Sequence, residues 1–176
     1  LERIRYITSH PSDMNNELIF EHKKNNKLMP YLHLPIQSGS NKILKKMNRK
    51  YTREEYIEIV NNLRYLKPDI ALSSDFIVGY PGETQKDFEQ TLSLVKKIRF
   101  ASSYSFKYSP RPGTPSSLKN QTSSDKEIEE RLRIIQYELN KQQKEFNFSF
   151  LGKNLSVLFE KIGKKKNQYV GRSQYL

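Results

Sequence analysis

Residues 70–83 read IALSSDFIVGYPGE, and this stretch decides the fold class. Its first nine residues are mostly apolar and end at glycine and proline, which predicts a strand over residues 70–78 and a turn over residues 79–83. An amphipathic helical pattern precedes the strand, and another follows the turn. A strand between two helices is the repeating unit of a parallel sheet, so the sequence predicts an α/β fold.

Capping signals mark where the neighbouring helices begin. Thr52 and Glu55 have the spacing of a capping box, and Thr84 with Asp87 begins the helix after the turn. Ser40 can cap an earlier short helix. A long helix near the carboxyl end follows a polar loop. The apolar positions expected to face the core are Tyr56, Val60, Leu63, Phe88, Leu92, Val95, Ile128, Leu132, Ile135 and Leu139.

Three more strands are predicted, at residues 3–8, 31–35 and 103–108. A helix from residue 13 to about residue 24, with Ser12 as its cap, is expected between the first two. Each strand is followed by a helical pattern, so the strands are expected to lie parallel with right-handed crossovers.

The character of the chain changes after Gly152. Residues 154–160 alternate apolar and polar side chains, which predicts a strand of a one-faced sheet. Residues 151–176 carry six Lys or Arg residues and one acidic residue. We therefore divide the chain into an α/β part, residues 1–150, and the start of a small basic β module, residues 151–176.

Composition excludes several classes of protein. The 176 residues contain no cysteine, which excludes a disulfide scaffold, a thiolate nucleophile and any iron–sulfur or zinc site held by this chain's thiolates. No apolar run reaches the roughly 18 residues that a membrane span needs, so we expect a cytoplasmic protein with no membrane contact. The net charge of +12 favours polyanions such as nucleic acid, although surplus lysine is commonly only a solvated surface.

Ligands of parallel α/β folds bind beyond the carboxyl ends of the strands. Asp75 is a carboxylate inside a strand that should be buried on both faces, so either it is satisfied locally or it accepts hydrogen bonds from the vicinal hydroxyls of a ribose. Gln37 and Ser38 fit beside it as neutral donors and acceptors. Arg49 is either a solvated cation or a guanidinium that binds a carboxylate or phosphate bidentately.

Other polar residues favour structural roles. His33 alternates with leucines and is expected to be a hydrogen-bonded histidine of the core or the site's mouth, whereas His10 is a weak active-site candidate. Glu83 is expected to stabilise a turn or a helix start. We find no Ser/His/Asp arrangement, phosphate loop or metal-ligand spacing, so the residues alone predict a ribose- or nucleotide-binding α/β domain joined to a basic module.

Five motifs follow one another along the chain: RIRYITSHP (3–11), HLPIQSGS (33–40), MNRKYTRE (47–54), DFIVGYPGET (75–84) and YSPRPGTP (108–115). In this order they resemble the motifs of the radical S-adenosylmethionine methylthiotransferases, and most closely those of the members that modify tRNA. The resemblance implies the later part of a partial (β/α)6, TIM-like barrel, followed by the start of TRAM, a small RNA-binding β-barrel.

The resemblance also implies site residues. Gln37 and Asp75, with Ser38 beside them, would contact the ribose of S-adenosylmethionine, and Arg49 its carboxylate. The turn that begins at Gly79 would lie near adenine. On the RNA side, the resemblance and the charge together indicate Arg111 and the lysines of the basic module, Lys164, Lys165 and Lys166. No residue is assigned a catalytic or metal-binding role.

The reaction of the tRNA-modifying members adds a methylthio group to an isopentenylated adenosine beside the anticodon, using S-adenosylmethionine and cysteine-bound 4Fe-4S clusters. A chain without cysteine is expected to be inactive by itself. The complete enzyme is expected to be a cytoplasmic monomer whose partner is tRNA. Two alternatives stay open: a sibling methylthiotransferase that acts on a ribosomal protein, and a non-catalytic basic RNA-binding remnant.

Overall fold

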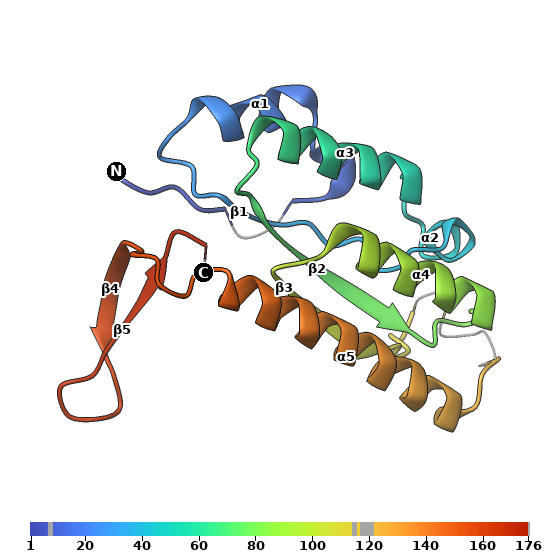
Figure 1. Cartoon of the computed structure of the whole chain (residues 1–176). Coiled ribbons are helices and arrows are strands. Elements are labelled where there is room, and N and C mark those ends of the chain that lie inside the picture. The colour runs from blue at the N-terminus through green and yellow to red at the C-terminus, as the bar shows by residue number, and fades with distance from the viewer. Residues whose placement is uncertain (7–8, 114–115, 117–121, 176) are drawn as a thin grey trace.

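A computed structural model describes residues 1–6, 9–113, 116 and 122–175. A parallel sheet with helices, as predicted for residues 1–150, forms the body of the protein, and a β-hairpin follows it (Figure 1). The elements are η1 (Pro11–Asp13), α1 (Asn16–Lys24), β1 (Tyr31–His33), α2 (Asn41–Lys46), α3 (Arg53–Leu66), β2 (Ala71–Val78), α4 (Gln85–Ile98), β3 (Ser102–Lys107), α5 (Asp125–Phe148), β4 (Val157–Ile162) and β5 (Tyr169–Ser173).

The three strands of the body lie parallel in the order β1-β2-β3, which confirms the predicted arrangement. Leu32 of β1 pairs with Leu72 of β2, and Asp75 of β2 pairs with Tyr104 of β3. In Figure 1, α1 lies beside α3, α4 lies beside α5, and the hairpin of β4 and β5 projects from the body. Strands in sequence order joined by helices are what right-handed βαβ units produce.

The two faces of the sheet differ. Phe76 and Val78 of β2 are fully buried and face the helices, whereas Asp75 and Ile77, which alternate with them, are only partly buried. Successive side chains of a strand point to opposite faces, so the face of Asp75 and Ile77 is open at the carboxyl end of β2, whereas Ala71 and Ser73 nearer its start are buried on that same face. The expectation that this strand is buried on both faces is therefore confirmed for residues 71–74 and wrong at Asp75 and Ile77.

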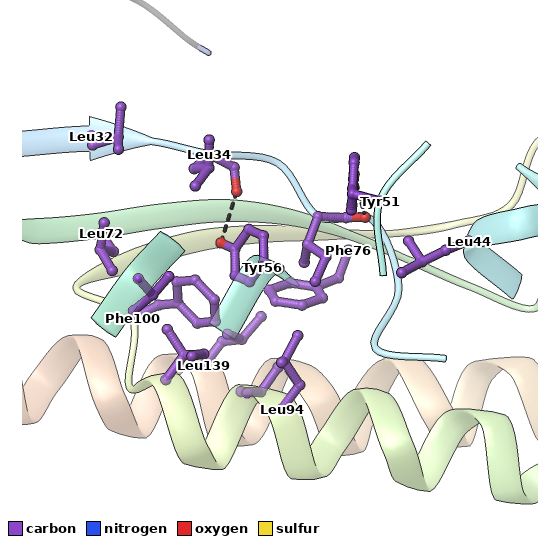
Figure 2. Packing of buried hydrophobic residues seen from close by; sticks show 14 of the residues in the cluster. Leu32, Leu34, Leu44, Tyr51, Tyr56, Leu72, Phe76, Leu94, Phe100 and Leu139 are labelled. Carbon is purple, nitrogen blue, oxygen red and sulfur yellow. Dashed lines mark hydrogen bonds between the residues drawn. The ribbon is translucent and has the colours of Figure 1, made fainter. Parts of the chain in front are cut away.

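The packed face holds the hydrophobic core, whose central side chains are shown in Figure 2. Phe76 meets Phe100 edge to face, with ring centroids 5.4 Å apart. The Tyr56 hydroxyl, carried by α3, donates a hydrogen bond of 2.9 Å to the carbonyl of Leu34. Because the phenol reaches a backbone acceptor, this tyrosine is buried without an unpaired polar atom.

The capping box predicted at Thr52 is confirmed, and the helix predicted to start at Thr84 and Asp87 begins with a second capping box. Thr52 and Glu55 cap α3 reciprocally, as Thr84 and Asp87 cap α4. The Ser40 side chain caps α2 by accepting from the backbone of Ile43. A further capping box, which was not predicted, begins α5 at Ser124 and Glu127.

Two predictions near the amino end are wrong. In place of a strand at residues 3–8 there is an isolated parallel bridge between Ile4 and Leu28; residues 7 and 8 lie outside the described residues. Among residues 3–6, which the structure describes, the ladder hydrogen bonds are those that Ile4 exchanges with residues 27 and 29. The first helix starts at Asn16 and is capped by Asn15, since Ser12 lies in the preceding 3-10 turn.

The basic hairpin departs from the expected one-faced sheet. β4 starts at Val157 and pairs antiparallel with β5, and its residues are exposed on both sides, including Leu158 and Phe159. A two-stranded hairpin has no second layer to cover either face among the described residues. It is anchored to the body where the Arg5 side chain donates to the carbonyls of Ser173 and Gln174, at 3.1 and 3.0 Å.

Asp87 joins the starts of two helices and should make stability depend on pH. It accepts hydrogen bonds from Ser40 (2.7 Å), Lys42 (2.8 Å) and Thr84 (2.6 Å). Burial by itself raises the pKa of Asp87, but these donors outweigh it and hold the pKa well below its usual range. A depressed folded-state pKa stabilises the fold above the unfolded pKa of about 3.9, and this stabilisation is lost as pH falls further.

We therefore expect Asp87→Asn to lower the free energy of unfolding by about 1–3 kcal/mol at pH 7. The difference between the variant and the wild type should shrink as pH falls below about 4. Urea unfolding at a series of pH values measures it, with Asp13→Asn as the matched control because Asp13 is exposed. A difference that does not change with pH would contradict the assignment.

Candidate functional site

A cavity of about 600 Å³ lies at the carboxyl ends of β2 and β3. It brings together Gln37, Arg49, Asp75 and Arg111, four predicted site residues that are far apart in the sequence. Its described lining is Gln37, Arg49, Asp75, Ile77, Phe106, Lys107, Tyr108, Ser109, Arg111 and Ser116. This is the edge of the sheet where a parallel α/β fold places its ligands.

Asp75 is held in place by a short polar chain along the open face. Nε2 of His33 lies 3.4 Å from Oδ2 of Asp75, and Nδ1 of the same ring lies 2.8 Å from the Ser73 hydroxyl. The two nitrogens of the ring thus face the Ser73 hydroxyl on one side and the Asp75 carboxylate on the other. His33 is thus hydrogen-bonded, as predicted, and it lies beside a carboxylate whose side chain remains 28% exposed.

Gln37 reaches the cavity through an unusual backbone conformation. Its φ is +76°, in the left-handed region that residues other than glycine seldom adopt. Its N–H donates to the Asp75 carbonyl, and its carbonyl accepts from the Ile77 N–H, both at 2.9 Å. These bonds carry the pairing with β2 beyond the end of β1 and offset the backbone strain at the site.

Arg49 is positioned by the end of α2. Asn48 takes a left-handed conformation, with φ of +57°, and the Arg49 N–H donates to the Leu44 carbonyl at 2.9 Å. Beside it the Tyr51 hydroxyl donates to the Ile36 carbonyl at 3.1 Å. Burial raises the pKa of Tyr51, whereas the nearby Arg49 guanidinium lowers it. Arg49 thus lines the cavity with its guanidinium near the Tyr51 phenol.

Ser38 and Gly79 do not line the cavity. Ser38 is fully buried, and its hydroxyl is 3.3 Å from that of Thr91 on α4. The Gly79 N–H donates to the Glu83 carboxylate at 2.8 Å, and its φ of +72° explains why glycine stands there. Both residues shape the loops around the cavity.

The turn after β2 depends on a residue that sequence reasoning missed. Glu83 stabilises the turn, as expected, but its carboxylate also pairs at 3.1 Å with Arg131 of α5, and both side chains are buried. Burial raises the pKa of Glu83, while hydrogen bonds from Gly79 and Arg131 act in the opposite direction. The helical spacing of the sequence indicates that Arg131 is buried, because position 131 lies on the same buried stripe as Ile128 and Ile135.

The remaining predicted residues lie elsewhere. Lys164, Lys165 and Lys166 are exposed in the turn of the hairpin and do not line the cavity. His10 accepts a hydrogen bond from the Ser12 N–H and packs edge to face against Tyr51, which indicates a structural role. The cavity residues that sequence reasoning missed are Ile77, Phe106, Lys107, Tyr108 and Ser116.

The chain supplies no thiolate, because it has no cysteine. Among residues 1–6, 9–113, 116 and 122–175, no group of three or more His, Asp or Glu side chains is placed to hold a metal ion. The helices within these same ranges include none that is long and apolar enough to cross a membrane.

Comparisons with known proteins agree with this fold. The family model of the radical SAM superfamily matches residues 1–95. Coproporphyrinogen III oxidase from Escherichia coli, a radical SAM enzyme, superposes with a TM-score of 0.63 at 18% identity over 77% of this chain and 32% of its own chain, a likeness of fold.

Curated relatives match over the whole chain. The tRNA-2-methylthio-N(6)-dimethylallyladenosine synthase of Wolbachia pipientis wMel is 57% identical over 177 residues, and the enzyme of the same name from Rickettsia rickettsii (strain Sheila Smith) is 56% identical over 176 residues. The match covers 100% of this chain and 40% of each relative. With more than half of its residues matched by the family model, the chain belongs to the radical SAM superfamily.

Proposed function

We propose that this chain is the S-adenosylmethionine-binding part of a radical SAM methylthiotransferase that modifies an N6-dimethylallyladenosine of tRNA. The observation that carries the proposal is the convergence of Gln37, Arg49 and Asp75 on one cavity at the carboxyl ends of the strands. The identity of 56–57% to two tRNA-2-methylthio-N(6)-dimethylallyladenosine synthases supports the substrate, and favours it over a ribosomal protein.

The donor set fits S-adenosylmethionine. The Asp75 carboxylate, oriented by His33, can accept hydrogen bonds from the two ribose hydroxyls. The Arg49 guanidinium can bind the amino-acid carboxylate bidentately, and Gln37 adds a neutral donor and acceptor. Ser38 and Gly79 hold the loops that enclose the nucleoside.

S-adenosylmethionine supplies radical chemistry in this superfamily, together with a 4Fe-4S cluster. The residues of this chain do not fit such a cluster, since they include no thiolate. The part of the reaction that this chain can perform is to bind and orient S-adenosylmethionine.

The RNA side of the proposal rests on charge. Residues 151–176 would begin the small RNA-binding β-barrel, and Lys164–Lys166 with Arg111 would lie along phosphates. The exposed apolar side chains of the hairpin agree with a barrel that needs further strands. We further propose that the complete enzyme is cytoplasmic and monomeric and that it acts on tRNA.

Ligand binding to the 176-residue chain tests the cofactor role. We expect Asp75→Asn and Arg49→Ala each to weaken the binding of S-adenosylhomocysteine, measured by calorimetry, about 10- to 100-fold, because each removes hydrogen bonds that involve a charged group. Asp13→Asn, an exposed carboxylate, should leave the affinity unchanged. Equal affinities for the wild type and both site variants, with unchanged circular dichroism, would overturn the proposal.

A further inference from the structure

Two aromatic side chains of β3 lie on the open face of the sheet. Tyr104 pairs with Asp75 and Phe106 pairs with Ile77, and paired residues of a parallel ladder share a face. The two aromatic residues are 60% and 53% exposed, and Phe106 also lines the cavity. The rings therefore stand two residues apart on the strand, next to the proposed S-adenosylmethionine site.

The side chains around these rings are polar, so this part of the face is a poor surface for packing against an apolar protein layer. The same face carries His33, which is hydrogen-bonded to the buried Ser73, and Asp75, whose carboxylate lies 3.4 Å from the His33 ring. Covering such groups with an apolar layer costs free energy, because their remaining polar atoms would lose water. The packed face, with Phe76 and Val78, is apolar in contrast. The open face suits a ligand that is planar and carries polar edges, as a nucleobase does.

Positive charge indicates that this ligand also carries phosphate. Arg111, which the proposed cofactor site does not use, lines the cavity at the carboxyl end of β3. Lys107 lies there too, although it is paired with Glu129 at 2.6 Å. Exposed aromatic side chains on a strand, flanked by cations, are a common platform on which the bases of single-stranded RNA stack.

We propose that Tyr104 and Phe106 form an aromatic shelf on which the adenine to be modified stacks, with Arg111 beside its phosphate. The apolar dimethylallyl group on that adenine suits the exposed ring faces, and stacking there would bring the base next to the cavity that contains Asp75. This inference rests on the proposed function, because it takes the RNA substrate from there.

Binding of the 176-residue chain to two labelled RNA stem-loops tests the shelf. One loop carries N6-dimethylallyladenosine and the other carries an abasic site at the same position. The wild type should bind the first more tightly, whereas Tyr104→Ala and Phe106→Ala should each reduce this preference about 5- to 100-fold. Tyr104→Phe should keep it, since the ring remains. Fluorescence anisotropy gives the affinities.

Matched variants separate the shelf from other effects. Tyr65→Ala and Tyr137→Ala remove tyrosines that are exposed on α3 and α5, and should leave the preference unchanged. Replacing Lys164, Lys165 and Lys166 together by alanine should weaken both stem-loops equally, because phosphate contacts do not read the base. A preference that survives both Tyr104→Ala and Phe106→Ala would overturn the shelf.

The experiments distinguish failure of the aromatic shelf from failure of the proposed function. Tyr104→Ala should leave the affinity for S-adenosylhomocysteine unchanged, because Tyr104 is not among the described residues that line the cavity. If Asp75→Asn weakens S-adenosylhomocysteine while no shelf variant changes the RNA preference, the shelf is wrong and the proposed function stands. If the shelf variants remove the RNA preference while Asp75→Asn and Arg49→Ala leave S-adenosylhomocysteine binding intact, the shelf is supported and the cofactor role is wrong.

Discussion

Arg131→Met is expected to lower the free energy of unfolding by about 3–5 kcal/mol. The reason is that the Glu83 carboxylate is buried and loses its charged partner, 3.1 Å away, when the guanidinium is removed. The guanidinium also donates to the Glu83 carbonyl at 3.3 Å and to the Ser123 hydroxyl at 3.1 Å. The substitution therefore releases the turn after β2 from α5 as well as leaving a buried charge unpaired.

Urea unfolding followed by circular dichroism measures this effect. Arg133→Met is the matched control, because Arg133 lies on the same helix in an exposed ion pair with Glu130 and should leave stability nearly unchanged. Adding Glu83→Gln to Arg131→Met should recover part of the loss, since no charge then remains buried. Equal losses for Arg131→Met and Arg133→Met would show that the buried pair does not hold the turn.

Phe76→Ala is expected to lower the free energy of unfolding by about 3–5 kcal/mol. The ring is fully buried between the sheet and the helices and contacts Phe100 (Figure 2). Its removal leaves a cavity that the surrounding rigid elements can fill only in part. Because Phe76 directly follows Asp75, its packing also fixes the strand that carries the carboxylate.

Phe106→Ala provides the comparison within the same sheet. Phe106 lies on the open face of β3 and is 53% exposed, so its removal should change the free energy of unfolding by less than about 1 kcal/mol. The two variants remove the same side chain from opposite faces. Similar losses in urea unfolding would mean that the open face is part of the core, and would contradict the proposed shelf as well.

These two stability predictions concern the same part of the molecule. The turn of residues 79–83 follows β2, and β2 carries Asp75 in the cavity wall. Phe76 holds the strand from the core side, and Arg131 holds the turn from α5. The candidate site is thus positioned by core packing at Phe76 and by the ion pair of Glu83 with Arg131.

Much of the fold could be predicted where local physics decides it. The capping boxes at Thr52 and Thr84 are satisfied by residues three positions away, so their sequence spacing is enough to locate the helix starts. The prediction of a strand at residues 3–8 is wrong for the opposite reason. Pairing partners decide whether an extended run becomes a ladder, and these lie elsewhere in the chain.

By itself, the sequence determined the α/β class, the helix starts and the residues Gln37, Arg49 and Asp75 as site candidates. Only the tertiary structure decided that these three share a cavity, that Ser38 faces α4 instead, and that one face of the sheet is open with two aromatic rings on it. The physical reason is that periodicity and capping act within a few residues, whereas burial depends on what other segments cover. Arg131 is an example. Its place on an apolar stripe is explained by Glu83, which lies 48 residues earlier in the chain and pairs with it only in the folded structure.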